Sequence, residues 1–318
     1  MIKVENVSKF YGSFKALNNI SFEINSGEVV GFLGPNGAGK TTTLKILTCN
    51  SLPHSGSISV GGHDVLTSER LVQKAIGYLP ESAPVYKEML VREYLTFMGQ
   101  VRGLKGKKLR EAVDKVSMET GITEKMSSPV AHLSKGYRQR VGLAQALIHT
   151  PEVLILDEPY TGLDPIQIIE IRNLIKNYGK KHTVILSSHI LQEVEATCSR
   201  VLIINNGEIV ADSPTEKLLS KNTVMSGIIG PDPEIRKAFS EIKAVNYLGD
   251  EVVSENEKSI LKIRLSSDTI SKDELSELVF NTCTKNSWKM ISLGEGRITF
   301  EDLFISLTGK SQKKGASK

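Results

Sequence analysis

A glycine-rich segment near the N-terminus has the residues of a phosphate-binding loop. Residues 34–41 read GPNGAGKT and fit the pattern G-x-x-x-x-G-K-[ST]. Glycines let backbone N–H groups curl into a nest around phosphate oxygens, and the following helix adds its positive N-terminal end. Lys40 can reach the β- and γ-phosphates, and the Thr41 hydroxyl can bind Mg²⁺. The predicted nucleotide contacts form one run: Gly34, Pro35, Asn36, Gly37, Ala38, Gly39, Lys40, Thr41 and Thr42.

Two adjacent carboxylates follow a continuous apolar run later in the chain. The run Val153–Leu156 predicts a strand that is buried on both faces, and Asp157 and Glu158 come directly after it. Such a strand would end at the sheet edge where the phosphate-binding loop also lies. Asp157 suits a contact to Mg²⁺, directly or through water, and Glu158 suits a general base that polarises the attacking water. The plainer alternative is an acidic pair that caps the next turn.

A third motif lies shortly before these carboxylates. Residues 133–147 read LSKGYRQRVGLAQAL, which predicts the start of a helix. Ser134 and Gly136 at its N-terminus offer a hydroxyl and backbone donors to a γ-phosphate. Ser134 also suits a simple N-cap, and the two roles are compatible.

In this order, the three motifs resemble the ATP-binding subunits of ABC transporters over about the first 215 residues. The resemblance makes residues 133–140 the ABC signature and gives family positions to four more residues. Tyr11 takes the place of the adenine-stacking aromatic, Glu81 that of the Q-loop glutamine, Asp164 that of the D-loop aspartate and His189 that of the switch histidine. Simpler interpretations are a surface aromatic for Tyr11, a turn residue for Asp164 and a strand end for His189.

The chain departs from the family pattern in the signature and in the Q-loop. Lys135 and Tyr137 stand where the signature most often has Gly and Gln, while Ser134 and Gly136 are kept. Glu81 replaces the usual glutamine, and its carboxylate can still lie near Mg²⁺. Glu81, the segment VYKEMLVREYL after it and residues 301–308 resemble the exporter branch that includes the gliding-motility ATPases.

The resemblance implies an ATP hydrolase that uses ATP and Mg²⁺, with Glu158, His189 and Lys40 as catalytic residues. It implies that two copies meet head to tail, so that each ATP is held between Lys40 of one copy and the signature, Ser134–Tyr137, of the other. It further implies a separate membrane permease, transport in the direction of export, and a cytoplasmic position on the inner face of the cell membrane. The alternative is a non-transport ABC ATPase that acts as a nucleotide-dependent switch on a protein partner.

Composition argues against several other classes of protein. The chain of 318 residues has a net charge of +4, from 40 basic and 36 acidic residues, so we expect no nucleic-acid partner. Its three cysteines fit no metal-binding spacing, and their odd number suits a reducing compartment. No apolar run approaches the ~18 residues that a membrane-spanning helix needs. If the protein serves transport, the pore must be another chain.

The motifs require an α/β core that brings strand ends together. Alternating residues at 2–7 and 20–24 predict an antiparallel edge layer, and residues 91–150 read as a helical insertion. Further core strands are expected at 29–33, 57–60, 153–156, 184–187, 201–204 and 208–211, with a helix at 40–48. Asn206-Gly207 predicts the turn of a hairpin between the last two strands.

The pattern changes near residue 222, which indicates a second domain. Residues 1–221 are predicted to form the nucleotide-binding domain, with a helical subdomain at about 87–150, and residues 222–318 a small accessory domain with a basic tail. A capping box at residues 213–216 predicts a last short helix of the first domain. Strands at 224–229, near 252 and at 260–265, with helices at 232–243 and 272–280, predict a small α+β domain of the ferredoxin-like kind.

Overall fold

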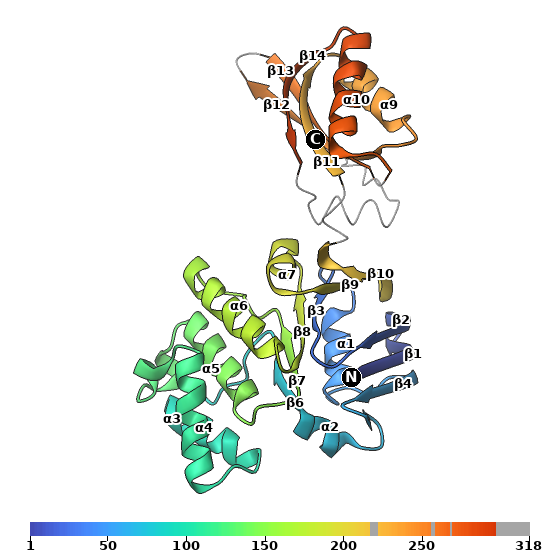
Figure 1. Ribbon diagram of the computed structural model, residues 1–318. Helices are drawn as coiled ribbons and strands as arrows, with labels where there is room; N and C mark the ends of the chain where they lie inside the picture. The colour runs from blue at the N-terminus through green and yellow to red at the C-terminus, as the bar shows by residue number, and fades with distance from the viewer. Residues whose placement is uncertain (217–221, 256–257, 268, 297–318) are drawn as a thin grey trace. The chain divides into compact units, whose positions relative to one another are not determined.

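The computed structural model describes residues 1–216, 222–255, 258–267 and 269–296 (Figure 1). The chain divides into two compact units, Met1–Ser213 and Pro214–Lys318. In the described residues, the first unit contains a six-stranded and a four-stranded sheet, and the second contains a four-stranded sheet. Each unit has its own hydrophobic core.

The larger sheet of the first unit has the strand order β10-β9-β3-β8-β7-β6. Its strands are β3 (Val29–Leu33), β6 (Ile76–Leu79), β7 (Val153–Asp157), β8 (Thr183–Ser188), β9 (Arg200–Asn205) and β10 (Glu208–Pro214). β3 pairs in parallel with β8 and β9, and β7 pairs in parallel with β6 and β8. The carboxyl ends of β3, β7 and β8 therefore meet at one edge of the sheet. β9 and β10 are joined at Asn206 and Gly207, whose φ values of 48° and 76° suit the predicted hairpin turn.

The smaller sheet of the first unit is the predicted antiparallel layer, in the order β2-β1-β4-β5. Its strands are β1 (Ile2–Tyr11), β2 (Phe14–Ile24), β4 (Ser55–Val60) and β5 (His63–Asp64). β1 and β2 are longer than their apolar alternation predicted, because they continue into a hairpin whose last pair is Tyr11 and Phe14. This hairpin carries aromatic side chains beyond the buried part of the layer.

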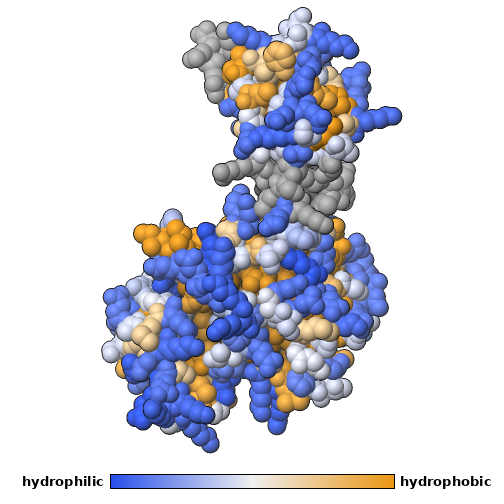
Figure 2. All heavy atoms as spheres, viewed as in Figure 1, coloured by the Kyte–Doolittle hydropathy of each residue, from blue (hydrophilic) through white to orange (hydrophobic). Residues whose placement is uncertain are grey.

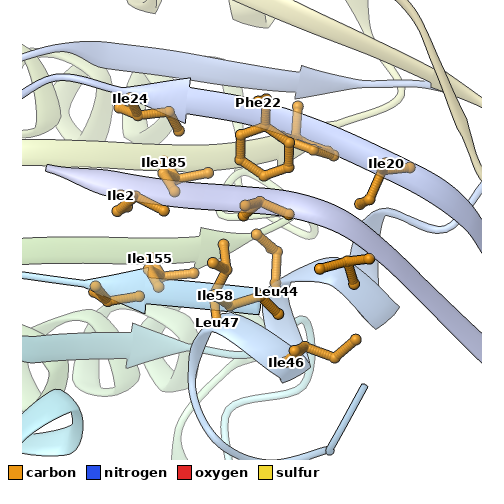
Figure 3. Close-up of a cluster of buried hydrophobic side chains, with 14 of the residues drawn as sticks. Ile2, Ile20, Phe22, Ile24, Leu44, Ile46, Leu47, Ile58, Ile155 and Ile185 are labelled. Carbon is orange, nitrogen blue, oxygen red and sulfur yellow. The ribbon is translucent and has the colours of Figure 1, made fainter. Parts of the chain in front are cut away.

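Helix α1 (Lys40–Leu47) lies between the two sheets (Figure 1). Its Leu44, Ile46 and Leu47 are buried against side chains of both sheets, such as Ile58 and Ile155 (Figure 3). Burying a side chain of this kind contributes about 1.5–3 kcal/mol. The core therefore fixes the start of α1, which is also the end of the phosphate-binding loop.

Helices supply the rest of the first unit. The helical insertion contains α3 (Val91–Val101), α4 (Gly106–Glu119), 3₁₀ turns at Thr123–Lys125 and Val130–His132, and α5 (Lys135–Leu147). The remaining helices are α2 (Glu69–Ala75), α6 (Pro165–Gly179) and α7 (Leu191–Thr197). The α/β fold class predicted from the sequence, with its edge layer and helical insertion, is confirmed.

The second unit has the strand and helix order β-α-β-β-α-β. Its elements are β11 (Asn222–Ile229), α9 (Asp232–Ser240), β12 (Asn246–Glu255), β13 (Lys258–Ser267), α10 (Lys272–Lys285) and β14 (Lys289–Glu295). The sheet order β12-β13-β11-β14 is that of a ferredoxin-like domain, as predicted. The sequence analysis missed β14, because six of its seven residues are exposed and it lacks a clear apolar alternation.

The expected helix start at residues 213–216 is partly wrong. Ser213 and Pro214 belong to β10, and the helical backbone begins at Thr215 and Glu216. Residues 217–221 lie outside the described residues, as do residues 301–308 and the basic tail.

Hydrophilic side chains cover most of the visible face of the molecule, with scattered apolar residues between them (Figure 2). In the part of the chain that the structure describes, no helix is both long enough and apolar enough to cross a bilayer.

Deleting the chain from Asn222 onward is expected to leave a soluble unit that still binds ATP. Among the described residues, the core cluster of the first unit draws on residues from Ile2 to Ile209, and that of the second on residues from Val224 to Met290. Gel filtration and binding of a fluorescent ATP analogue measure the result. Aggregation that is reversed by co-expressing residues 222–318 would contradict the prediction, because the second part would then complete the first core.

Candidate functional site

A cavity of about 420 Å³ opens at the edge of the larger sheet. It is lined by residues from the β1–β2 hairpin, the phosphate-binding loop, α1 and the ends of three other segments: Tyr11, Phe14, Ala16, Pro35, Asn36, Gly37, Ala38, Gly39, Lys40, Thr41, Thr42, Glu81, Glu158, Thr161 and His189. The structure thus brings together residues that lie up to 178 positions apart in the sequence, from Tyr11 to His189. Most of the predicted nucleotide contacts are among them.

Glycines shape the phosphate-binding loop for steric reasons. Gly39 is the N-cap of α1 and has a φ of 112°, which residues with a side chain rarely adopt. A Cβ atom at Gly34 would lie 2.3 Å from the carbonyl oxygen of Ile204. Only glycine fits this close approach to β9, so the loop lies tightly against the sheet.

Lys40 is folded back into the loop that precedes it. Its Nζ donates to the carbonyl oxygen of Gly34 at 2.7 Å and to that of Pro35 at 3.3 Å, and its side chain is 6% exposed. The same Nζ lies 3.6 Å from Oε1 of Glu158. The ammonium group is therefore held next to the N-terminus of α1, where a phosphate anion would be bound.

Glu158 lies at the centre of the polar contacts. Its side chain is 11% exposed, and besides Lys40 it contacts Nδ1 of His189 through Oε2 at 3.0 Å. Its backbone is left-handed, with a φ of 49°, which is uncommon for a residue with a long side chain. A cation and an imidazole thus hold the carboxylate in place beside the cavity.

Asp157 is almost completely buried directly behind Glu158. Its Oδ1 accepts from the hydroxyl of Ser187 at 2.5 Å, and among the described residues its buried Oδ2 has no hydrogen-bond partner. A buried carboxylate oxygen with no partner is costly, and it is a ligand of the kind that Mg²⁺ prefers. The residues present therefore fit the predicted metal, with the hydroxyl of Thr41 as a second oxygen ligand in the cavity lining.

The turn that carries His189 is fixed by its neighbours. Ser188 donates to Oε2 of Glu193 at 2.5 Å and accepts from the backbone N–H of Ile190 at 3.0 Å. Burial raises the pKa of the Glu193 carboxyl, the bond from Ser188 opposes this, and the charge of Glu158 adds to the rise. His189 itself is 48% exposed, so its ring can meet a ligand from the cavity side.

Two aromatic side chains stand at the mouth of the cavity. Tyr11 is 49% exposed and Phe14, its partner across the hairpin, is 60% exposed. Exposed aromatic faces that line a cavity are suited to stacking on a nucleotide base. Phe14, Ala16 and Thr161 also line the cavity, although no motif in the sequence predicted them. Phe14 could have been predicted from its position opposite Tyr11, but only if the pairing of β1 with β2 had been known.

The signature residues and Asp164 do not line this cavity in the part of the chain that the structure describes. Ser134 is the N-cap of α5 and accepts from the backbone N–H of Tyr137 at 3.3 Å. Asp164 is the N-cap of α6 and accepts from the backbone N–H of Gln167 at 2.9 Å. Both residues thus have the plain capping role, which leaves their role toward a second copy a prediction. Exposed Glu81, in contrast, lines the cavity as expected.

Lys135 and Tyr137, the two residues that depart from the usual signature, each contact a neighbouring turn. Lys135 packs over Gly162, where a Cβ atom would lie 2.7 Å from its Cδ. The hydroxyl of Tyr137 donates to Glu124 at 2.9 Å, which lowers the pKa of that carboxyl. The start of α5 is therefore tied to the turns on either side of it.

Replacing Tyr11 by Ala is expected to weaken ATP binding by about 1–3 kcal/mol, the scale of stacking between a base and an aromatic ring. Inorganic triphosphate should bind the variant as well as it binds the wild type, because the phosphate-binding loop is unchanged. Tyr11→Phe keeps the flat ring and should restore most of the affinity for ATP. Fluorescence titration with ATP and triphosphate measures this, and an equal loss for both ligands would contradict base stacking.

The chain is similar in sequence and structure to known ATP-binding proteins of transporters. Residues 17–161 match the family profile described as ABC transporter. The chain is 33% identical to the linearmycin resistance ATP-binding protein LnrL of Bacillus subtilis (strain 168) over 317 residues, which cover 98% of this chain and 99% of that protein. It is 37% identical to the bacitracin transport ATP-binding protein BcrA of Bacillus licheniformis over 224 residues, or 70% and 72% of the two chains. Among solved structures, cbiO1 from Clostridium perfringens, part of the ABC transporter complex cbiONQ, has a TM-score of 0.62 at 28% identity and covers 76% and 95%.

Proposed function

We propose that two copies of this chain close around two ATP molecules and thereby drive a separate membrane permease. The chain belongs to the family of ABC transporter ATP-binding proteins. The chain is the ATP-binding subunit of an ABC transporter and an ATPase. The observation that carries the mechanism is the cavity in which Glu158 contacts both Lys40 and His189 beside the phosphate-binding loop.

The proposed catalytic roles follow from these contacts. Glu158 accepts a proton from the water that attacks the γ-phosphate, or polarises that water, because its carboxylate lines the cavity and lies 3.6 Å from the Lys40 ammonium. His189, held at 3.0 Å from Glu158, donates to the γ-phosphate and keeps the carboxylate in position. Lys40 exchanges its loop carbonyl partners for phosphate oxygens when ATP enters.

Mg²⁺ is the proposed metal, which Thr41, Asp157 and Glu81 would hold. Thr41 and Glu81 line the cavity, and Asp157 is buried next to Glu158. When bound, it would neutralise charge on the phosphates. Asp157 is suited to this because one of its oxygens is already fixed by Ser187 while the other has no partner among the described residues.

Dimerisation is proposed because the signature residues do not line the cavity of their own chain among the described residues, so they are placed to contact the ATP of a second copy. Ser134, Gly136 and the neighbouring Asp164 lie at helix N-termini, which attract anions. In a head-to-tail pair, they would complete the site of the second copy. Loss of the bridging γ-phosphate then loosens the pair, which switches the permease between two states.

Export is the proposed direction of transport. It is supported by the resemblance to the exporter branch and by the names of two relatives, which mention linearmycin resistance and bacitracin transport. Cells in which Lys40→Ala replaces the wild-type chain are expected to become more sensitive to a compound that is exported. Unchanged sensitivity across a panel of membrane-active antibiotics that includes bacitracin would contradict export of such compounds.

A phosphate-release assay tests the function as a whole. The purified chain is expected to release phosphate from ATP in the presence of Mg²⁺, and the release should rise more than in proportion to protein concentration, since two copies form one working unit. Activity strictly proportional to concentration in a protein that stays monomeric with ATP would contradict the proposed pair.

A further inference from the structure

A buried serine near the end of strand β8 bonds to the carboxylate of Asp157 and to the backbone N–H of Glu158. Ser187 is 0% exposed, and it pairs with Asp157 on β7 and with Phe32 on β3. β8 is therefore the strand between the one that leads into the phosphate-binding loop and the one that ends in the carboxylates. A side chain at its carboxyl end lies close to both.

The Ser187 hydroxyl makes two hydrogen bonds of opposite direction. It donates to Oδ1 of Asp157 at 2.5 Å and accepts from the backbone N–H of Glu158 at 3.0 Å. A hydroxyl is suited to this because it has one donor and two acceptor lone pairs. One buried atom thereby links two consecutive residues that have different proposed roles.

The bond to Asp157 decides which carboxylate oxygen is left for a ligand. The hydrogen bond to Oδ1 restricts the rotation of the Asp157 carboxylate. Oδ2 remains as the oxygen without a partner among the described residues. Groups that hold a metal-binding carboxylate in this way set its geometry. The bond from Glu158 holds a residue in the left-handed region, where a φ of 49° has to be stabilised by its surroundings.

We propose that Ser187 is a positioning residue that aligns Asp157 for the metal and Glu158 for the attacking water through a single hydroxyl. This inference rests on the proposed function, because it takes Asp157 and Glu158 in the roles given there. Ser188, the next residue, bonds to Glu193 and Ile190 instead, so the positioning role belongs to Ser187 alone among these two serines.

The test compares Ser187→Ala with Thr183→Ala. Thr183 lies on the same strand at its other end, is 3% exposed and accepts one hydrogen bond from the backbone N–H of Gly27 at 3.0 Å. Both variants lose a buried hydroxyl, but only Ser187→Ala loses one beside the carboxylates. Ser187→Thr keeps the hydroxyl and is the rescue variant, and Ser187→Cys keeps the volume with a much weaker donor.

Ser187→Ala is expected to lower kcat by about 10–100-fold and to weaken binding of Mn²⁺ with a non-hydrolysable ATP analogue by a similar factor, the range for residues that orient metal ligands. Electron paramagnetic resonance of Mn²⁺ measures the metal affinity apart from turnover. Binding of the metal-free analogue in EDTA should stay at the wild-type level, and Ser187→Thr should recover both kcat and Mn²⁺ affinity. Thr183→Ala should keep the wild-type kcat and Mn²⁺ affinity, even if its melting temperature falls by as much as that of Ser187→Ala.

Three outcomes would overturn the inference. They are wild-type kcat and Mn²⁺ affinity in Ser187→Ala, equal losses in Thr183→Ala, and a matching loss of affinity for the metal-free analogue. If Ser187→Ala does not fold, wild-type values in folded Ser187→Cys would overturn it in the same way. Wild-type turnover in Glu158→Gln would instead refute the proposed function, so the two failures can be told apart.

Discussion

Glu158→Gln is expected to lower the turnover of ATP by about 10²–10⁴-fold, the contribution typical of a general base. The amide keeps the size of the side chain and can still contact His189, but it cannot polarise water as a carboxylate does. ATP binding should persist, because the loop, Lys40 and Asp157 are unchanged. Removing the negative charge 3.6 Å from the Lys40 ammonium also frees that ammonium for phosphate, which favours tighter binding of ATP.

The uncleaved ATP should then hold two copies together. Gel filtration of Glu158→Gln with ATP, with ADP and without nucleotide is expected to show a dimer with ATP only. Adding Ser134→Arg should abolish the dimer, because it places bulk and charge at the start of α5, where the second copy's ATP is proposed to bind.

Glu152→Gln is the matched control for this experiment. Glu152 directly precedes β7 and is exposed, while Glu158 directly follows the strand at its other end, by the cavity. Glu152→Gln should leave both the turnover of ATP and the oligomeric state at wild-type levels. Wild-type hydrolysis by Glu158→Gln would show that another group is the base, and a monomer at saturating ATP would show that the isolated chain does not close on its own.

Lys40→Ala is expected to weaken ATP binding by about 10²-fold or more, because hydrogen bonds from a charged group to phosphate contribute about 1.5–3 kcal/mol each. The substitution also removes the cation beside Glu158, which leaves that nearly buried carboxylate with the His189 imidazole as its remaining side-chain partner among the described contacts. The triphosphate would then meet an uncompensated negative charge. Isothermal titration with ATP measures the loss.

Lys45→Ala provides the comparison on the same helix. Lys45 is exposed in the last turn of α1 and is not among the cavity-lining residues, so ATP affinity should stay at the wild-type level. Circular dichroism should show that both variants are folded, since the core face of α1 is formed by Leu44, Ile46 and Leu47. Near-normal affinity in folded Lys40→Ala would contradict the assignment of the phosphate-binding loop.

The chemistry proposed for the site was predictable from residue types and their spacing alone. Each motif is a continuous run of residues whose types have one main physical use: a glycine nest before a lysine, or a buried apolar strand that ends in Asp157 and Glu158. Local patterns of this kind depend on neighbours in the chain, so spacing and residue type are enough to read them. The parallel core strands and the alternation of the edge layer were predictable for the same reason.

The tertiary structure decided which residues meet. Phe14 entered the cavity lining through the pairing of β1 with β2. Ser187 reached the Asp157 carboxylate and the Glu158 backbone because the register of β7 and β8 sets it opposite Asp157. β14 joined its sheet by pairing with β11 although its own residues are mostly exposed. Contacts of this kind join positions tens of residues apart, and they follow from strand order and register. Those are settled by the packing of the whole core, so no local run of residues could have indicated them.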